Sequence, residues 1–226
     1  MNPLEAILRP LDSDLPPYPA KRIVLANGES MVIRQAVREE VPRLLETLEP
    51  LLQVPRDYYD IVGARTYAEL LGWRRYRVKD EYCLVGVLDG MLVGLVNGRS
   101  LSRNIGISLH TLALRRGLRI GAHLFASKME YHMDFLRQKE VYIVAESPIG
   151  FRRWMIEYSL EERPHVAHEL GGVMSYGLTR PLYAACKDRL VVGERPVSED
   201  LLASTLDFRI PESDMLVAQV AGEKRT

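Results

Sequence analysis

The residues that point most clearly to chemistry lie in one stretch, LHTLALRRGLRIGAHLF at 109–125. An apolar strand pattern runs into a loop of arginines and glycines, and that loop opens a helix pattern. A helix N-terminus presents unpaired N–H groups and a positive dipole end, and glycine lets the backbone approach a ligand closely. We therefore predict a cradle for a phosphate or pyrophosphate group here. The alternative is a basic loop on a solvated surface.

The charge around this loop agrees with an anionic ligand. Residues 90–129 contain no Asp or Glu and six basic residues: Arg99, Arg103, Arg115, Arg116, Arg119 and Lys128. Over the whole chain of 226 residues, 30 Lys and Arg balance 30 Asp and Glu. That balance argues against nucleic acid or an anionic membrane as a partner. A basic segment within a neutral chain suits one phosphorylated ligand instead.

The elements that must position the loop follow from the hydrophobic pattern. Asn27-Gly28 and Asp89-Gly90 are strong hairpin signals between β-rich runs. A third hairpin is expected at 165–180, turning at Gly171-Gly172. The spacing of apolar residues predicts the remaining elements. We expect strands at 22–25, 31–35, 82–88, 91–97, 106–114 and 141–145, and helices at 37–52, 57–72, 120–135 and 151–162.

This order predicts an α/β chain of the α+β type, with a mixed, mostly antiparallel sheet and helices on both faces. Residues 1–20 hold five prolines and are expected to form an extended arm. Residues 21–185 form the domain. Residues 186–226 form an acidic tail, expected to pack on the domain or on a second subunit. The tail includes a strand-like RLVV and a short helix opened by Ser198-Glu199-Asp200.

The sequence also bears on the cellular setting. No apolar run reaches the roughly 20 residues of a membrane helix, and the N-terminal segment lacks the apolar core of a signal peptide. The two cysteines, Cys83 and Cys186, are too few for a disulfide framework. No metal site is expected, since the histidine spacing matches no metal signature. We therefore expect a cytoplasmic protein without a membrane partner.

Taken in order, the segments over about residues 30–182 resemble the GNAT superfamily of acyl-CoA N-acyltransferases. MVIRQAVREEVPRLLETL is similar to the opening strand and first helix of the family, and CLVGVLDGMLVGLVNGR to its second and third strands. LHTLALRRGLRIGAHLF resembles the fourth strand, pyrophosphate loop and third helix, and VYIVA with FRRWMIEYSLEE the fifth strand and fourth helix. The resemblance implies a splayed parallel strand pair and acetyl-CoA as the cosubstrate.

The resemblance also assigns cofactor-binding residues. Backbone groups of Leu112, Ala113 and Leu114 would pair with the pantetheine amides, as in strand addition. The family loop R/Q-x-x-G-x-G/A corresponds here to Arg116, Gly117, Leu118, Arg119, Ile120, Gly121 and Ala122. Arg119 stands where the first glycine of the motif normally lies. Its side chain would either obstruct the backbone's approach to the ligand or add a phosphate contact.

Acyl transfer to an amine needs a base, oxyanion donors and an acid for the leaving thiolate. Glu146 follows a strand directly, at a common place for ligand chemistry. His110 lies on the strand before the loop, and histidine titrates near neutrality. Tyr158 is the candidate acid, shifted from the position of the family's tyrosine. His110 as a core histidine and Tyr158 packed against the sheet edge are the structural alternatives.

These residues favour an N-acetyltransferase that moves the acetyl group of acetyl-CoA to an amine of a small molecule or protein. Direct attack fits, because no cysteine lies in the motif region to form an acyl-enzyme. One alternative is a module of the same fold that binds CoA, or no ligand, without catalysis. Another is a transferase for longer acyl chains. The arm and tail are compatible with a homodimer, although nothing in the sequence requires one.

Overall fold

The computed structural model describes residues 15–54, 59–78, 80–144, 148–168 and 174–221. In this part of the chain eight strands form one sheet, in the order β1-β2-β3-β4-β5-β6-β8-β7. Only β5 and β6 are parallel among the described neighbours. The strands are β1 (Lys21–Val24), β2 (Ser30–Gln35), β3 (Glu81–Leu88), β4 (Met91–Ser100), β5 (Ile105–Ala113), β6 (Glu140–Ile143), β7 (Glu161–Glu162) and β8 (Tyr176–Thr179).

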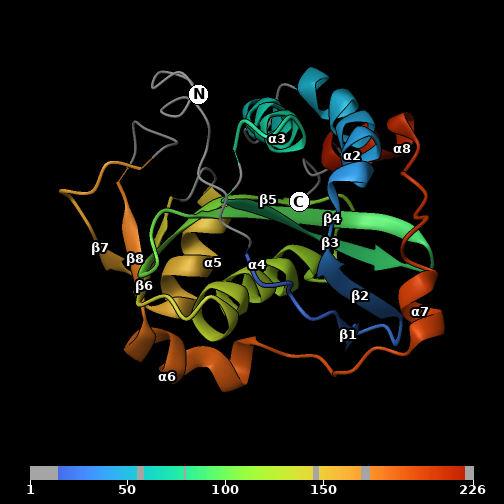
Figure 1. Ribbon diagram of the computed structural model, residues 1–226. Helices are drawn as coiled ribbons and strands as arrows, with labels where there is room; N and C mark the ends of the chain where they lie inside the picture. Colours follow the sequence, from blue (N-terminus) through green and yellow to red (C-terminus); the bar gives the residue numbers. More distant parts are fainter. Residues whose placement is uncertain (1–14, 55–58, 79, 145–147, 169–173, 222–226) are drawn as a thin grey trace, which may run out of the picture.

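Helices cover both faces of the sheet, which confirms the predicted fold class (Figure 1). One face carries α2 (Val41–Leu48), α3 (Tyr59–Arg74) and α8 (Ser213–Ala221). The other carries α4 (Ile120–Glu130), α5 (Pro148–Tyr158) and α6 (Arg180–Leu190). Shorter elements complete the set: the 3-10 turns η1 (Arg38–Glu40) and η2 (Glu49–Gln53), the π-helical turn η3 (Tyr131–Phe135) after α4, and α7 (Glu199–Ala203).

Several predicted elements have different limits in the structure. The helix expected at 37–52 is divided into η1, α2 and η2, because prolines occupy the first turns of α2 and η2. The third hairpin has its first strand at Glu161–Glu162 rather than near 165, and its expected turn at Gly171-Gly172 lies outside the described residues. The strand expected at RLVV is wrong. Its first two residues end α6, whose Tyr183 and Cys186 are buried one helical turn apart.

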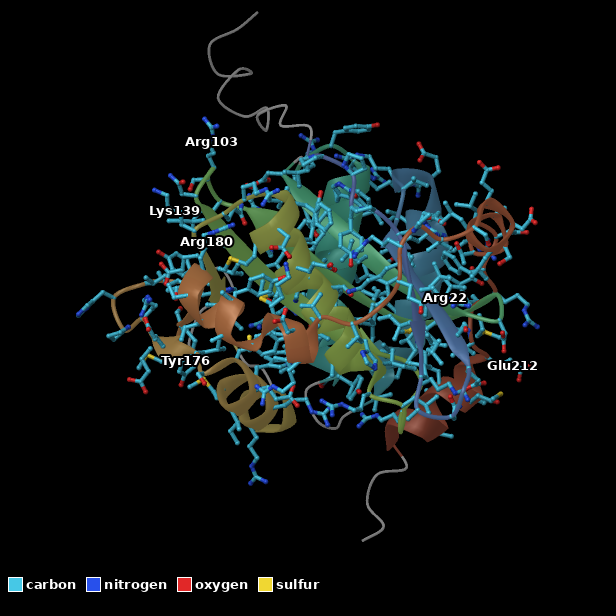
Figure 2. The ribbon with its side chains drawn as sticks, turned by 90° about the horizontal axis from the view of Figure 1, so that it is seen from below. Arg22, Arg103, Lys139, Tyr176, Arg180 and Glu212 are labelled. Atoms are coloured by element: carbon cyan, nitrogen blue, oxygen red, sulfur yellow. The ribbon has the colours of Figure 1, made fainter. Side chains whose placement is uncertain are left out.

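Two apolar layers hold the sheet between the helices. On the α3 face, Leu44 and Leu70 pack with Leu95 and Leu112 of the central strands. Phe208 from the tail is fully buried in the same layer, so the tail completes the core of this face. On the opposite face α4 and α6 run across the sheet, as the view from below shows (Figure 2). There Arg103, Lys139 and Arg180 lie at one end of the molecule and Arg22 at the other.

A buried ionic network joins the N-terminal segment, α4 and the tail. Glu130 accepts from Lys21 Nζ at 2.9 Å, from Arg195 Nη1 at 2.9 Å and from the Tyr18 hydroxyl at 2.7 Å. Burial alone would raise the pKa of Glu130. The bonds from Arg195, Lys21 and Tyr18 outweigh burial and hold the pKa below its usual value. The network therefore fastens three distant parts of the chain to one carboxylate.

We predict that Glu130→Gln destabilises the protein by about 3 kcal/mol at pH 7, because it leaves buried cations without their counter-charge. The native pKa is depressed, so this contribution is complete above the ordinary carboxyl value of 4.5 and is lost as the pH falls through the native value. Urea denaturation of both proteins between pH 7 and pH 3 measures the difference. Glu194→Gln is the control, because Glu194 pairs with Arg22 at the surface. An equal effect of the two substitutions would contradict this account.

Candidate functional site

The candidate site begins where β5 and β6 part. The parallel pairing covers only 105–108 of β5 and 140–143 of β6. β5 continues to Ala113, so its edge from Leu109 onward is not paired with β6. In the described part of the chain β6 does not pair with this edge, so the backbone groups there that bind no other residue can pair with a strand-like ligand. We call this edge, from Leu109 to Ala113, the β5 opening.

The ladder with β4 determines which groups face the β5 opening. Leu114 N donates to Val93 O at 2.9 Å, which makes these two residues a hydrogen-bonded pair. Such pairs alternate along an antiparallel ladder. Leu112 therefore faces β4, whereas Thr111 and Ala113 turn their N–H and C=O groups to the opening. Of the three residues predicted to bind pantetheine, Ala113 turns its backbone groups to the β5 opening. Leu112 faces β4, and the N–H of Leu114 donates to Val93 of β4.

A bulge in β5 lies at the start of the opening. The register with β4 changes from Val96↔Thr111 to Gly98↔Ser108, so β5 has one extra residue opposite Asn97. His110 N donates to the side chain of Asn97 at 2.9 Å instead of to a β4 carbonyl. Bulges turn the local backbone and redirect side chains, and they are frequent beside active sites.

The loop after β5 holds the residues of the predicted cradle. Gly117 has φ +87°, and Arg119 is the N-cap of α4 in the left-handed conformation, without a side-chain cap. The first backbone bond of the helix joins His123 N to Arg119 O at 3.1 Å. Within the described residues the N–H groups of Ile120, Gly121 and Ala122 have no acceptor, as expected for an uncapped first turn. These donors at the positive end of the helix dipole suit an anion.

Each arginine of the loop contacts another part of the protein. Arg115 pairs with Glu29 at 2.9 Å. Arg116 donates to the Tyr59 hydroxyl at 2.6 Å and lies 5.0 Å from the centre of that ring. Arg119 pairs with Glu157 of α5 at 2.9 Å and is 58% exposed. A surface ion pair such as that of Arg119 exchanges partners at little cost, so the Arg119 side chain can meet a phosphate.

A polar cluster lies on the α3 face beside the bulge. His110 Nε2 and Glu69 Oε1 are 3.1 Å apart. Asn97 Nδ2 donates to Glu69 Oε2 at 2.6 Å and to Glu81 Oε1 at 3.0 Å. His110 is buried, whereas 23% of the Glu69 side chain is exposed. The four residues come from α3, β3, β4 and β5, and Glu69 is the member that reaches solvent.

Glu81 is unusual within this cluster. Burial raises the pKa of its carboxyl to about 8, and the charge of Glu69 adds to the rise, while the hydrogen bond from Asn97 opposes it. Its Oε2 atom is buried and has no hydrogen-bond partner in the described part of the chain. The same is true of the hydroxyl of Ser108, the residue before the bulge. Two buried oxygen atoms near the bulge, Glu81 Oε2 and Ser108 Oγ, thus lack a partner among the described residues.

Of the three predicted catalytic residues, the two that the structure describes lie apart from each other. His110 lies in the polar cluster, four residues before the cradle loop begins. Tyr158 is buried on the α4 face, edge to face with Phe125 at 5.2 Å, and burial raises its pKa. Glu146 lies outside the described residues. Sequence reasoning missed Glu69, Glu81 and Asn97. The last two were visible as polar residues within otherwise apolar strand patterns.

Among the described residues no helix is long and apolar enough to cross a membrane. No group of three or more His, Cys, Asp and Glu side chains in those residues is arranged to hold a metal ion.

Comparisons with known proteins concern the fold. No family model and no curated protein matches the sequence. Among solved structures, an uncharacterized protein from Bacillus halodurans aligns with a TM-score of 0.56 and 8% identity, over 76% of this chain and 96% of its own. A spermidine N-acetyltransferase from Vibrio cholerae aligns with a TM-score of 0.49 and 14% identity, over 68% of this chain and 96% of its own. The GNAT domain of S. lividans PAT aligns with a TM-score of 0.49 and 11% identity, over 74% of this chain and 99% of its own.

The architecture agrees with the GNAT-like fold that the sequence predicts. In its described part the sheet is mostly antiparallel with one splayed parallel pair, β5 and β6, and helices cover both faces.

We predict that Glu81→Gln becomes more stable relative to the unaltered protein as the pH rises from 5 to 8. The native pKa of about 8 lies above the ordinary 4.5, so the unaltered protein loses stability over this interval as the unfolded chain ionises. The variant lacks this titrating group, so its free energy of unfolding does not fall with pH for this reason. Urea denaturation at pH 5, 6.5 and 8 measures it. Glu161→Gln, on an exposed strand, is the control. A stability difference that does not change with pH would contradict the conclusion that the Glu81 carboxyl is buried and neutral.

Proposed function

We propose that this protein is an acyl-CoA-dependent N-acyltransferase, with acetyl-CoA as the donor and an amine as the acceptor. The observation that carries the proposal is the alignment of two binding features along one segment. The uncapped N-terminus of α4 suits an anion, and the β5 opening just before it suits a chain of amides. Coenzyme A has a pyrophosphate at one end of a pantetheine arm with two amides.

The backbone at the opening supports the chemistry of acyl transfer. In the reaction the amine nitrogen forms a bond to the thioester carbon, and the carbon–sulfur bond then breaks to release the thiolate. Negative charge develops on the carbonyl oxygen before that bond breaks. The N–H of Thr111 faces the opening next to the bulge, where it can donate to this oxygen. The thiolate takes up a proton when it leaves.

The polar cluster supports a route for the proton of the amine. An amine attacks as the free base, so its ammonium form must first lose a proton. Glu69 and His110 form a hydrogen-bonded pair with Glu69 at its solvent side. We assign this pair the role of base. Glu146 remains the alternative base predicted from the sequence. Tyr158 remains a prediction as the acid, and its burial favours the packing role instead.

The second candidate is a module that binds CoA without catalysis. It is favoured by one observation, namely that all three loop arginines already contact protein groups. The two candidates share the cradle and differ in turnover. The acceptor, a small molecule or a protein amine, and a homodimeric assembly remain expectations from the sequence, as do cytoplasmic location and the lack of a nucleic acid partner.

We predict that acetyl-CoA raises the melting temperature of the unaltered protein and that Gly121→Asp abolishes the rise. A Cβ at Gly121 would meet Ala113 at an ordinary 3.5 Å, so the substitution fits sterically. An acidic residue in the first helical turn favours the free protein and repels a phosphate. Thermal denaturation with millimolar acetyl-CoA measures both effects. Gly121→Ala is the matched control and keeps the shift. A full shift in Gly121→Asp would place the cradle elsewhere.

We predict that Glu69→Gln and His110→Gln each lower turnover by about 10²-fold or more, the usual scale for loss of a general base. Their acetyl-CoA-induced melting shifts stay unchanged, because neither residue belongs to the cradle. Thiol release across a panel of primary amines measures turnover. Asp60→Asn, on the first turn of α3, is the control. Turnover in the unaltered protein that survives both substitutions would remove this pair as the base, and binding without any turnover would favour the non-catalytic module.

A further inference from the structure

Lys128 is a buried lysine on the side of α4 that meets the β5 bulge. Its side chain is inaccessible to solvent, and its ammonium lies 5.5 Å from the ring of Phe125. Lysine is almost never fully buried unless its charge is compensated. The partners that hold this charge therefore bear on what the residue does.

Lys128 donates hydrogen bonds to three consecutive residues of β5. Nζ donates to His110 O at 3.0 Å, to Leu109 O at 3.4 Å and to Thr111 Oγ1 at 3.2 Å. An ammonium has three N–H donors, and these three acceptors span the bulge. In a regular strand successive carbonyls point to opposite sides. Here one ammonium holds two successive carbonyls, so Lys128 fixes the irregular part of β5.

The hydrogen bonds from Lys128 also orient the N–H groups at the bulge. In a trans peptide the C=O of one residue and the N–H of the next point in opposite directions. Because Leu109 O points toward Lys128, the His110 N–H points away from Lys128. It donates to Asn97 of the polar cluster on the α3 face. With His110 O toward Lys128, the Thr111 N–H likewise points away from Lys128. The ladder alternation independently turns that N–H to the opening.

We propose that Lys128 is a positioning residue for acyl transfer, which holds the bulge so that the Thr111 N–H meets the thioester carbonyl. The inference rests on the proposed function. A cation on the carbonyl of a peptide polarises its N–H, and the effect is stronger in a buried setting. The benefit is largest when the carbonyl oxygen carries negative charge. Lys128 should therefore act on turnover more than on binding of acetyl-CoA.

The test compares Lys128→Met with Lys139→Met, a surface lysine just before β6. Acetyl-CoA affinity is measured by calorimetry. Turnover is measured as thiol release with water and with primary amines as acceptors. The backbone amide of Thr111 is followed by nuclear magnetic resonance in the free protein. In Lys128→Met we expect kcat to fall by about 10²-fold, as for loss of an oxyanion donor, with an affinity within about threefold and a displaced Thr111 amide resonance. Lys139→Met changes none of these.

Lys128→Gln covers the case in which Lys128→Met does not fold, because its amide still donates to carbonyls while the charge is gone. We expect it to bind acetyl-CoA and to lose turnover. An unchanged kcat in either folded variant overturns the proposal while leaving the proposed function intact. Equal loss of affinity and kcat, or an unmoved Thr111 resonance, shows a merely structural lysine and also overturns it. Failure of the unaltered protein to bind acetyl-CoA overturns the proposed function and this inference with it.

Discussion

The separation of β5 from β6 after Ser108 is the constraint on which the rest of the site depends. An unpaired strand edge in the middle of a sheet exposes backbone groups that would normally be satisfied by a neighbour. From β1 to β5 the neighbouring strands are antiparallel, with register shifts in the β3–β4 and β4–β5 ladders. The extra residue of β5 lies where the separation begins, and Lys128 satisfies two carbonyls there. The fold thus retains a row of donors and acceptors for a ligand.

The two faces of the sheet contribute different groups at the β5 opening. The α3 face contributes ionisable groups, with Glu69, Glu81 and His110 linked through Asn97. The α4 face contributes electrostatic support, from the helix N-terminus and from Lys128. In the proposal, Glu69 and His110 accept the proton of the amine, and the Thr111 N–H at the β5 opening donates to the carbonyl oxygen. In the proposed reaction, the amine approaches from the side of Glu69, and coenzyme A extends along β5 to α4.

Much of the fold was predictable because its signals are local. Asn27-Gly28 and Asp89-Gly90 determine their turns through backbone conformation, and both hairpins are present. The loop between β5 and α4 was predictable because an apolar strand pattern, an Arg/Gly stretch and a helix pattern follow one another there. Hairpin signals and apolar spacing gave the order of elements along the chain, whereas the order of strands across the sheet was not predicted. The tail was harder to predict. Among the described side chains α6 buries Tyr183 and Cys186 and α8 buries Leu216, so the apolar period of each helix was weak.

The polar site was less predictable, because its members are brought together only by the sheet. Glu69 and His110 are 41 residues apart, and no spacing rule links them. Lys128 resembles any lysine on a surface helix until its burial is known. Arg119 takes a left-handed conformation in a position that favours glycine, and its guanidinium meets α5. Tyr158 had a suitable residue type near the expected place, but its helix directs it into the core.

A crystal structure of the protein with acetyl-CoA tests the central claim most directly. The account predicts the pyrophosphate on the N–H groups of Ile120, Gly121 and Ala122, and the pantetheine arm along the β5 opening. It predicts the thioester oxygen within about 3 Å of Thr111 N. Coenzyme A bound away from β5, or along β5 with its thioester turned away from the bulge, would contradict the account.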